Sequence, residues 1–227
     1  MNHLIMIWWK LFILIMVGSI QFIHNKNNQQ FVQWTVNDKN HIQNILIPLL
    51  NKYPPLTSRF HLQFQFMIDS MKNPNIQYYL QNKNSKYKLQ NKICLISKNH
   101  LPSYFKEWLA GFIETKGSFH IWKMDKNYSF HISHYHDKYI INAIQSFYNT
   151  NIQVQHNKQK EYSDNIHYQI SFSSINDILK VVQHCKPLLQ GHQFLSLINF
   201  LQNNPKLTFM IKLLKLKSVM LSCYYES

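Results

Sequence analysis

Hydrophobic and polar positions along the chain follow two different periods, and together they predict a mixed α and β fold. Residues 31–36 (FVQWTV) and 167–172 (HYQISF) alternate with a period of two, which is typical of strands with one buried face. A polar helix-start signal follows each segment, at Asn37-Asp38 in the first case and at residues 174–177 (SIND) in the second. We therefore expect a helix directly after each of these strands.

The two strands belong to a pattern that occurs twice, which predicts an internal repeat. In the first copy a helix runs to Tyr53-Pro54-Pro55, and another apolar helix covers about residues 60–71. In the second copy the break falls at residues 186–188 (KPL), and a final helix begins over residues 193–201. The segment between the copies, residues 73–100, is rich in Asn, Lys and Tyr and is either a solvated irregular strap or an RNA-contacting arm.

The first copy is shorter than the second. Gly18 and Pro55 lie 37 positions apart, whereas Gly117 and Pro187 lie 70 apart, which leaves the first copy 33 residues short. In the second copy the extra length fits a strand near residues 128–133, a helix near 137–148 and a strand near 152–156. The first copy lacks this block, and the turn-forming residues 25–28 (NKNN) join its strands at 20–24 and 31–36. Whether those two strands pair directly is left open.

An apolar run at the N-terminus allows two interpretations. Residues 4–20 are apolar except for Lys10, Gly18 and Ser19, as in a signal peptide or a membrane anchor. However, Lys10 interrupts the run, and it leads into residues 17–22 (VGSIQF), which parallel residues 116–121 (KGSFHI). We therefore predict a helix that is buried against a second helix ending near Gly117, and no membrane span.

Charge and composition narrow the class of partner. The 227 residues include 24 Lys and Arg against 10 Asp and Glu, so the net charge is +14, and a nucleic acid is expected ahead of a membrane surface. Arg59 is the only arginine, while Asn, Gln, Ile and Lys abound, a bias typical of an AT-rich genome. This composition suggests a mitochondrial, organelle-encoded protein, whose gene would need no import peptide. Cys94, Cys185 and Cys223 are far apart and fit reduced thiols rather than a disulfide framework or a zinc site.

Residues 108–119 (WLAGFIETKGSF) contain a helix end followed by a glycine and a strand start. The stretch resembles the motif of the LAGLIDADG homing endonucleases and maturases, and echoes of the organellar two-repeat branch occur at residues 53–59 (YPPLTSR) and 137–140 (DKYI). The resemblance implies an α+β fold of two pseudo-symmetric αββαββα repeats, with the first repeat truncated here. The expected domains are a truncated first repeat at 1–72, a linker at 73–100, a second repeat at 101–204 and a basic amphipathic C-terminal tail at 205–227.

The same resemblance locates the family's metal-binding acids. In that family each motif helix ends with an acid, and the two acids bind Mg²⁺ for phosphodiester hydrolysis. The matching positions here are Val17 and Lys116, and neither side chain can ligate a hard cation. Glu114 matches the motif's earlier acid, but two residues along a helix rotate a side chain by about 200°, so it should not reach the same point. We therefore predict no catalytic residue, no bound metal and no cofactor.

Polar strand positions lie where the family reads DNA. At strand spacing His134 and His136 share one face while His131 lies on the other, and a solvent- or nucleic-acid-facing role is favoured over metal binding. The predicted nucleic-acid-binding residues are Lys116, His120, Lys123, Lys126, Tyr128, His134, His136, Gln155, Lys158 and Lys160.

The predicted function follows from the shortened repeat and the missing acids. With one half truncated, a base-by-base grip on a long DNA site is not expected, whereas lysine contacts to phosphates and tyrosine stacking suit folded RNA. We therefore expect a non-catalytic RNA-binding scaffold, such as a repurposed component of an organellar ribosome, with rRNA or intron RNA and possibly other proteins of a ribonucleoprotein as partners. Two alternatives stay open: a group I intron maturase, and a LAGLIDADG DNA endonuclease that retains activity.

Overall fold

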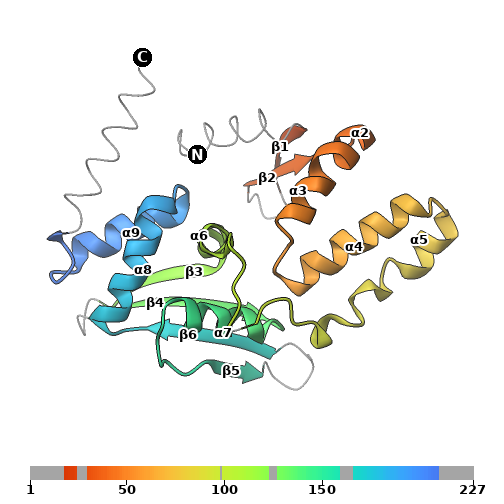
Figure 1. Ribbon diagram of the computed structural model, residues 1–227. Coiled ribbons are helices and arrows are strands. Elements are labelled where there is room, and N and C mark those ends of the chain that lie inside the picture. Colours follow the sequence, from red (N-terminus) through yellow and green to blue (C-terminus); the bar gives the residue numbers. More distant parts are fainter. Residues whose placement is uncertain (1–17, 25–29, 98, 123–126, 159–165, 210–227) are drawn as a thin grey trace, which may run out of the picture. The chain divides into compact units, whose positions relative to one another are not determined.

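The computed structural model describes residues 18–24, 30–97, 99–122, 127–158 and 166–209 (Figure 1). The predicted N-terminal helix, with Val17, and most of the predicted tail lie outside these residues. The chain divides into two compact units, residues 1–55 and 56–227, and each is described by itself. Within the described residues no helix is long and apolar enough to span a membrane.

The first unit contains a two-stranded antiparallel hairpin. Strand β1 (Ser19–His24) pairs with β2 (Gln30–Thr35), and the register runs from Ser19 opposite Thr35 to His24 opposite Gln30. The two strands of the shortened copy therefore pair directly. Helix α2 (Lys39–His41), the π-helical turn η1 (Ile42–Leu46) and α3 (Ile47–Lys52) follow, and Asp38 begins them as predicted by accepting a hydrogen bond from the Asn40 N–H.

The second unit begins with a helical segment that leads out of the predicted first repeat. Helix α4 (Ser58–Lys72) is followed by α5 (Ile76–Asn82) and by two 3₁₀ turns, η2 (Ser85–Tyr87) and η3 (Gln90–Lys92). The alternative of a wholly irregular strap is therefore wrong. Asn75 explains the difference, because its side chain accepts hydrogen bonds from the Gln77 and Tyr78 N–H groups and so caps α5.

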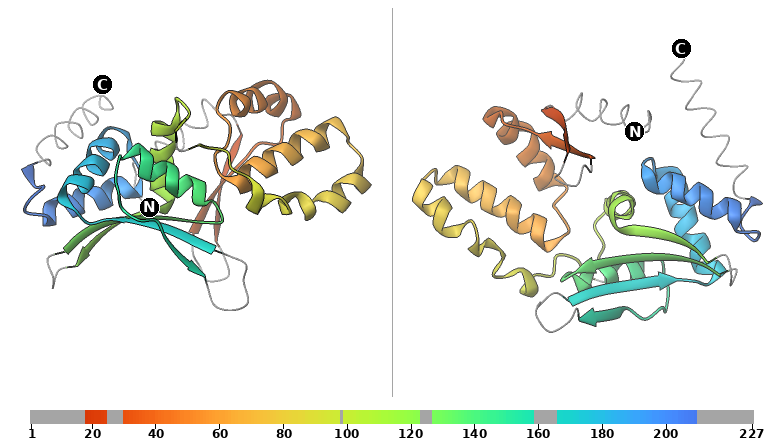
Figure 2. Two further views of the ribbon diagram at one scale, coloured as in Figure 1. Left: turned by 60° about the horizontal axis from the view of Figure 1, so that its bottom comes forward. Right: turned by 180° about the vertical axis from the view of Figure 1, so that it is seen from behind.

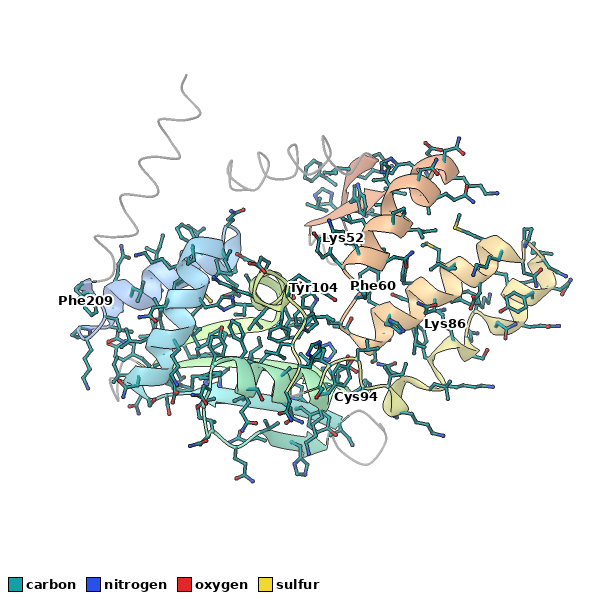
Figure 3. All side chains as sticks on the ribbon, in the orientation of Figure 1. Lys52, Phe60, Lys86, Cys94, Tyr104 and Phe209 are labelled. Atoms are coloured by element: carbon teal, nitrogen blue, oxygen red, sulfur yellow. The ribbon has the colours of Figure 1, made fainter. Side chains whose placement is uncertain are left out.

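Contacts between cationic and aromatic side chains join the turn η2 to helix α4. The Tyr87 ring lies beneath the Arg59 guanidinium, 4.7 Å from the ring centroid, and beneath the Lys86 ammonium, 4.6 Å away. The side-chain amide of Gln63 on α4 also donates to the Tyr87 hydroxyl at 2.6 Å. Figure 3 shows Lys86 beside α4. Part of the linker's positive charge is thus held against aromatic rings.

The remainder of the second unit has the predicted αββαββα order and one further helix. The elements are α6 (Phe105–Lys116), β3 (Gly117–Trp122), β4 (Asn127–Tyr135), α7 (Lys138–Phe147), β5 (Gln155–Lys158), β6 (Ile166–Phe172), α8 (Ile175–Leu188) and α9 (His192–Asn203). The four strands form an antiparallel sheet in the order β3-β4-β6-β5. Helices α6 to α9 lie together on one face of this sheet (Figure 2).

The core lies between that face and the four helices. Alternate residues of the two central strands, Phe130 and Ile132 on β4 and Ile170 and Phe172 on β6, are at most 1% exposed. Each such side chain stabilises the fold by about 1.5–3 kcal/mol relative to an exposed one. Their helical partners in the same cluster include Leu109, Ile113, Ile140, Ile144, Val181 and Phe200.

Gly117 stands at the predicted close junction between helix and strand. A Cβ atom there would lie 2.8 Å from both the Ile113 carbonyl oxygen and its Cγ2, and 3.0 Å from the Phe130 ring. The Gly117 φ of −78° is open to any residue, so the requirement for glycine comes from close packing.

Two predicted boundaries differ from the structure. Residues 186–188 are not a break, because α8 continues through Pro187 to Leu188 and ends only at Leu189, where the backbone becomes extended. Strand β5 begins at Gln155 rather than near residue 152, because the Gln145 side-chain amide binds the Ile152 carbonyl and holds it out of the sheet.

Candidate nucleic-acid interface

The face of the four-stranded sheet that is turned away from α6–α9 carries rows of polar side chains. Because Phe130 and Ile132 are buried under the helices, the intervening residues Ser129, His131 and Ser133 of β4 point the other way. The strand register then fixes which neighbours share that side. We call this surface the open face, and its residues are Ser118, His120, Trp122, Asn127, Ser129, His131, Ser133, Tyr135, Gln155, His167, Gln169 and Ser171.

His131 lies at the centre of the open face within a hydrogen-bond network. Its Nε2 is 2.8 Å from the Ser129 hydroxyl, and its Nδ1 is 2.7 Å from the Ser171 hydroxyl. The Gln169 side-chain amide donates to the same Nδ1 at 3.2 Å and to the Ser171 hydroxyl at 3.0 Å. Since an amide nitrogen can only donate, Nδ1 is the acceptor and Nε2 carries the proton. The network therefore holds the imidazole in one orientation and one tautomer.

His131 also has a second histidine as its neighbour. The His120 ring meets it edge to face, with the ring centroids 4.8 Å apart. Burial lowers the pKa of His131, and the nearby His120 lowers it further. The centre of the open face thus presents a neutral, positioned hydrogen-bonding group at ordinary pH.

Two of the predicted nucleic-acid-binding residues point to the opposite, helix-covered side. The Tyr128 hydroxyl donates to the Asn203 carbonyl, and its ring meets Phe200 edge to face. The His134 ring packs against Phe112, with centroids 5.5 Å apart. Burial lowers the pKa of His134, and the carboxylate of Asp137, 3.5 Å from Nδ1, opposes that shift. The structure thus separates these two residues from His120 and Gln155, which do lie on the open face.

Further predicted positions lie at the margin of the sheet. His136 is not in a strand but in the turn after β4, with a left-handed φ of 68°, and it lines a depression of about 530 Å³ together with Arg59 and Gln63. Lys116 is exposed at the last residue of α6, and its charge contributes to lowering the pKa of His134. Lys123, Lys126, Lys160 and the side chain of Lys158 lie outside the described residues.

Glu114, the carboxylate nearest to Lys116 along the helix, has a structural role. Its Oε1 accepts hydrogen bonds from the backbone N–H groups of Gln190 and Gly191, at 2.9 and 2.8 Å, and its Oε2 accepts one from Gln193 at 3.1 Å. The carboxylate therefore caps the start of α9 and is directed away from the end of α6.

These positions decide whether the described residues fit a divalent cation. No group of three His, Cys, Asp or Glu side chains within them could hold a metal ion. At the end of α6, Lys116 is a cation and Glu114 is occupied by three N–H donors. Within the described residues, the end of α6 therefore does not fit Mg²⁺.

Most of the open face escaped the sequence analysis. Ser118, Ser129, Gln169 and Ser171 were not singled out, although the alternation contained the signal. Phe130 and Ile132 are the large apolar residues of the segment, and they assign the odd-numbered residues of β4 to the side opposite the core.

Comparisons with known proteins identify relatives of this chain. The family model described as LAGLIDADG endonuclease matches residues 10–71. A protein named "Probable intron-encoded endonuclease aI3" from Dictyostelium discoideum is 28% identical over 146 residues, which cover 64% of this chain and 61% of that protein. A protein of the same name from Debaryomyces hansenii is 30% identical over 223 residues, covering 83% of this chain and 31% of that protein. The chain spans less than two thirds of the length of these relatives.

Solved structures share the fold. The LAGLIDADG homing endonuclease I-LtrWI, bound to its target DNA, has a TM-score of 0.60 and 21% identity, with 93% of this chain and 78% of that one covered. The LAGLIDADG meganuclease I-AabMI, bound to uncleaved DNA, has a TM-score of 0.59 and 17% identity, with coverages of 91% and 78%. The α+β fold with LAGLIDADG-type topology is thereby confirmed.

The comparisons overturn the predicted function. The curated relatives are named endonucleases, so the prediction of a non-catalytic ribosomal scaffold that is not an enzyme is wrong. The preference for RNA over DNA is unsupported, because the solved neighbours are complexes with DNA. That prediction rested on Val17 and Lys116 at the family's acid positions and on the shortened first repeat.

Proposed function

Because the chain belongs to the LAGLIDADG family, we propose that it is a DNA endonuclease of the intron-encoded kind, which binds duplex DNA over the open face. The observation that carries this proposal is the open face itself. It presents hydrogen-bonding side chains from all four strands, and helices α6–α9 cover only the other side. Strands placed in this way can read base edges in the major groove, which distinguishes all four base pairs.

Two glutamines are the strongest candidates for base contacts. Gln155 and Gln169 are opposite each other in the β5–β6 register, so their side chains emerge side by side on the open face. A glutamine amide can bind adenine through two hydrogen bonds, and each such contact contributes about 1–3 kcal/mol of discrimination. Gln169 donates its two amide hydrogens to His131 and Ser171, which holds its Oε1 in position to accept one hydrogen bond from a base and lowers the entropic cost of that contact.

Charge supplies the part of the affinity that does not depend on base sequence. With a net charge of +14, the chain should release counterions from DNA on binding, so its affinity should fall steeply with salt. Lys116 is exposed and pairs with no carboxylate among the described residues, so it can contact a phosphate beside the sheet. Because the described end of α6 does not fit Mg²⁺, we assign the cleavage step to none of the described residues.

The gene's location belongs to the same proposal. The Lys, Asn and Ile bias of the chain and the intron-encoded naming of its relatives together support an organellar, mitochondrial origin.

The test is a cleavage and binding assay on the full 227-residue chain. A library of randomised AT-rich duplexes is incubated with the protein and Mg²⁺, and both the bound and the cut fractions are sequenced. We expect enrichment of one sequence family and breaks at a constant position within it. Duplex binding without breaks would refute the endonuclease, and the absence of duplex binding would refute the interface as well.

Two variants test whether the open face is the surface that recognises the DNA sequence. Gln169→Ala should relax the preference at one or two base pairs and weaken specific binding by about 5- to 150-fold. Leu195→Ala is a matched control, because Leu195 is 41% exposed on α9, on the other side of the sheet. If both variants lose the same affinity, the open face is not the reading surface.

A further inference from the structure

A depression of about 930 Å³ lies at one end of the sheet, where β3 ends, β4 begins and β6 passes into α8. The chain that leaves α9 forms its remaining wall. Ser129, His131 and Ser171 line both this depression and the open face, so the two surfaces are continuous. We call it the end groove, and its volume is within the range of small-molecule binding sites.

One wall of the end groove offers an aromatic surface. Trp122 is 58% exposed, although tryptophan is normally highly buried. Its position opposite Asn127, in the last pair of the β3–β4 register, places the indole at the edge of the sheet. Indole rings at protein surfaces stack on nucleobases irrespective of their sequence, since every base has a π-face.

The wall formed by the chain that leaves α9 offers a hydrogen-bond donor. Asn204 is only 2% exposed, and its Oδ1 accepts from the Lys206 N–H at 3.1 Å. Its side-chain amide nitrogen, however, makes no hydrogen bond to any described residue, although Asn204 lines the groove. Because this nitrogen is accessible from the groove, a ligand oxygen there can accept a hydrogen bond from it.

The end groove also has a cationic side chain. Lys206 is exposed at the mouth of the groove and forms no ion pair with the described carboxylates. An aromatic ring, an amide donor and an ammonium group together match the three parts of a nucleotide: a flat base, oxygen acceptors and a phosphate.

We propose that the end groove binds one unpaired nucleotide of a DNA strand, with its base stacked on Trp122 and its oxygens at Asn204 and Lys206. Continuity with the open face favours a nucleotide that belongs to a strand over a free one. This goes beyond the proposed function, which concerns paired DNA; the choice of a DNA strand as the occupant rests on that function, but nucleotide binding in the groove does not depend on cleavage.

The test uses the full chain and a fluorescein-labelled octathymidylate, followed by fluorescence anisotropy. We expect Trp122→Leu to weaken binding by about 5- to 150-fold, whereas Trp122→Phe retains most of it. Tyr135→Leu is the matched control, because Tyr135 is another exposed aromatic residue of the open face, 40% exposed, at the far end of β4. Its loss should change the affinity less than about twofold.

The donor and the cation have separate tests. Asn204→Asp preserves the Oδ1 acceptor for the Lys206 N–H but replaces the donor with a negative charge, so it should weaken binding at least as much as Trp122→Leu. Lys206→Gln should reduce the slope of log affinity against log salt by about 0.7, the value for one phosphate of a single strand. Circular dichroism confirms that each variant remains folded.

Two outcomes would overturn the proposal: unchanged octathymidylate binding by Trp122→Leu, or equal losses in Trp122→Leu and Tyr135→Leu. Duplex binding is measured on Lys206→Gln, because Lys206 lies outside the open face, and it should stay within about threefold of wild type. If duplex binding fails in the wild-type chain while the octathymidylate still binds through Trp122, the proposed function falls and the end groove stands.

Discussion

Replacing Glu114 should destabilise the second unit through the start of α9. Its carboxylate accepts three backbone hydrogen bonds, of 2.8 to 3.1 Å, from Gln190, Gly191 and Gln193. Hydrogen bonds to a charged group contribute about 1.5–3 kcal/mol each, but the Gln190 N–H is exposed and water can replace that bond. Helix-capping losses of about 0.5–2 kcal/mol give a lower bound. Together they place Glu114→Ala at about 2–4 kcal/mol in the free energy of unfolding.

Glu114→Gln should cost less, about 1–2 kcal/mol, because one oxygen can still accept from Gln190 and Gly191. The new NH₂ group would face the Gln193 N–H, so that bond is lost. Urea denaturation followed by circular dichroism measures both variants, and the alanine variant should lower Tm by roughly 5–15 °C.

A metal-binding role for Glu114 would give a different pattern. Both variants would then change the dependence of DNA cleavage or binding on Mg²⁺ while leaving the urea midpoint in place. A stability loss below about 0.5 kcal/mol for Glu114→Ala, within the range of ordinary surface substitutions, would refute the capping role.

Four further variants test other parts of the second unit. Gly117→Val should cost more than about 3 kcal/mol, since even a Cβ would lie 2.8 Å from the Ile113 carbonyl, whereas Gly111→Ala, with nothing within 4 Å, should be neutral or stabilising in the same urea titration. Asp137→Ala should cost about 2–3 kcal/mol by urea titration, because a carboxylate that is 1% exposed would no longer accept from the Ser58 N–H. Burial lowers the pKa of His184 below its ordinary value near 6.5. The stabilising contribution of the neutral ring is therefore complete above pH 6.5 and is lost as the pH falls toward the folded-state pKa. The free energy of unfolding should be lower at pH 5.5 than at pH 7.5, and His184→Gln should reduce this difference.

The hydrogen bonds of His184 explain why its protonation should destabilise the fold. Its Nδ1 is 2.6 Å from the Tyr148 hydroxyl, and its Nε2 is 2.9 Å from the Lys106 carbonyl, so Nε2 donates and Nδ1 accepts. A protonated ring would turn both nitrogens into donors and break the bond in which Tyr148 donates. An unchanged pH dependence in His184→Gln would assign the effect to His131 or His134, whose pKa values are lowered as well.

The parts of the fold that the sequence predicted well depend on local signals. The change of period at Gly117, the strand alternation around Phe130 and the polar start at Ser174 each specify an element boundary within a few residues, and the structure has α6, β3, β4 and α8 there. Helix α5 was missed because its cap, Asn75, stands in a segment where asparagine is abundant and therefore uninformative.

The candidate site was harder to predict because it depends on pairing between strands. His131 and His134 look alike in the sequence, and only the burial of Phe130 and Ile132 decides which of the two reaches the open face. Asn204 and Trp122 are 82 positions apart, so the end groove arises only when the β3–β4 hairpin and the end of α9 meet. The proposed reaction class, DNA cleavage, rests on the names of the relatives, because residue types alone did not indicate it.

If the chain binds duplex DNA as proposed, the direct pairing of β1 with β2 has a consequence for the symmetry of the bound sequence. A two-stranded ribbon in the first unit offers half as many strands as the four-stranded sheet of the second. If each strand contributes a similar number of base contacts, the two halves of the recognised sequence carry unequal information, with roughly twice as much in the half read by β3–β6. The recognition sequence should then be lopsided, tolerant of substitutions on one flank and strict on the other.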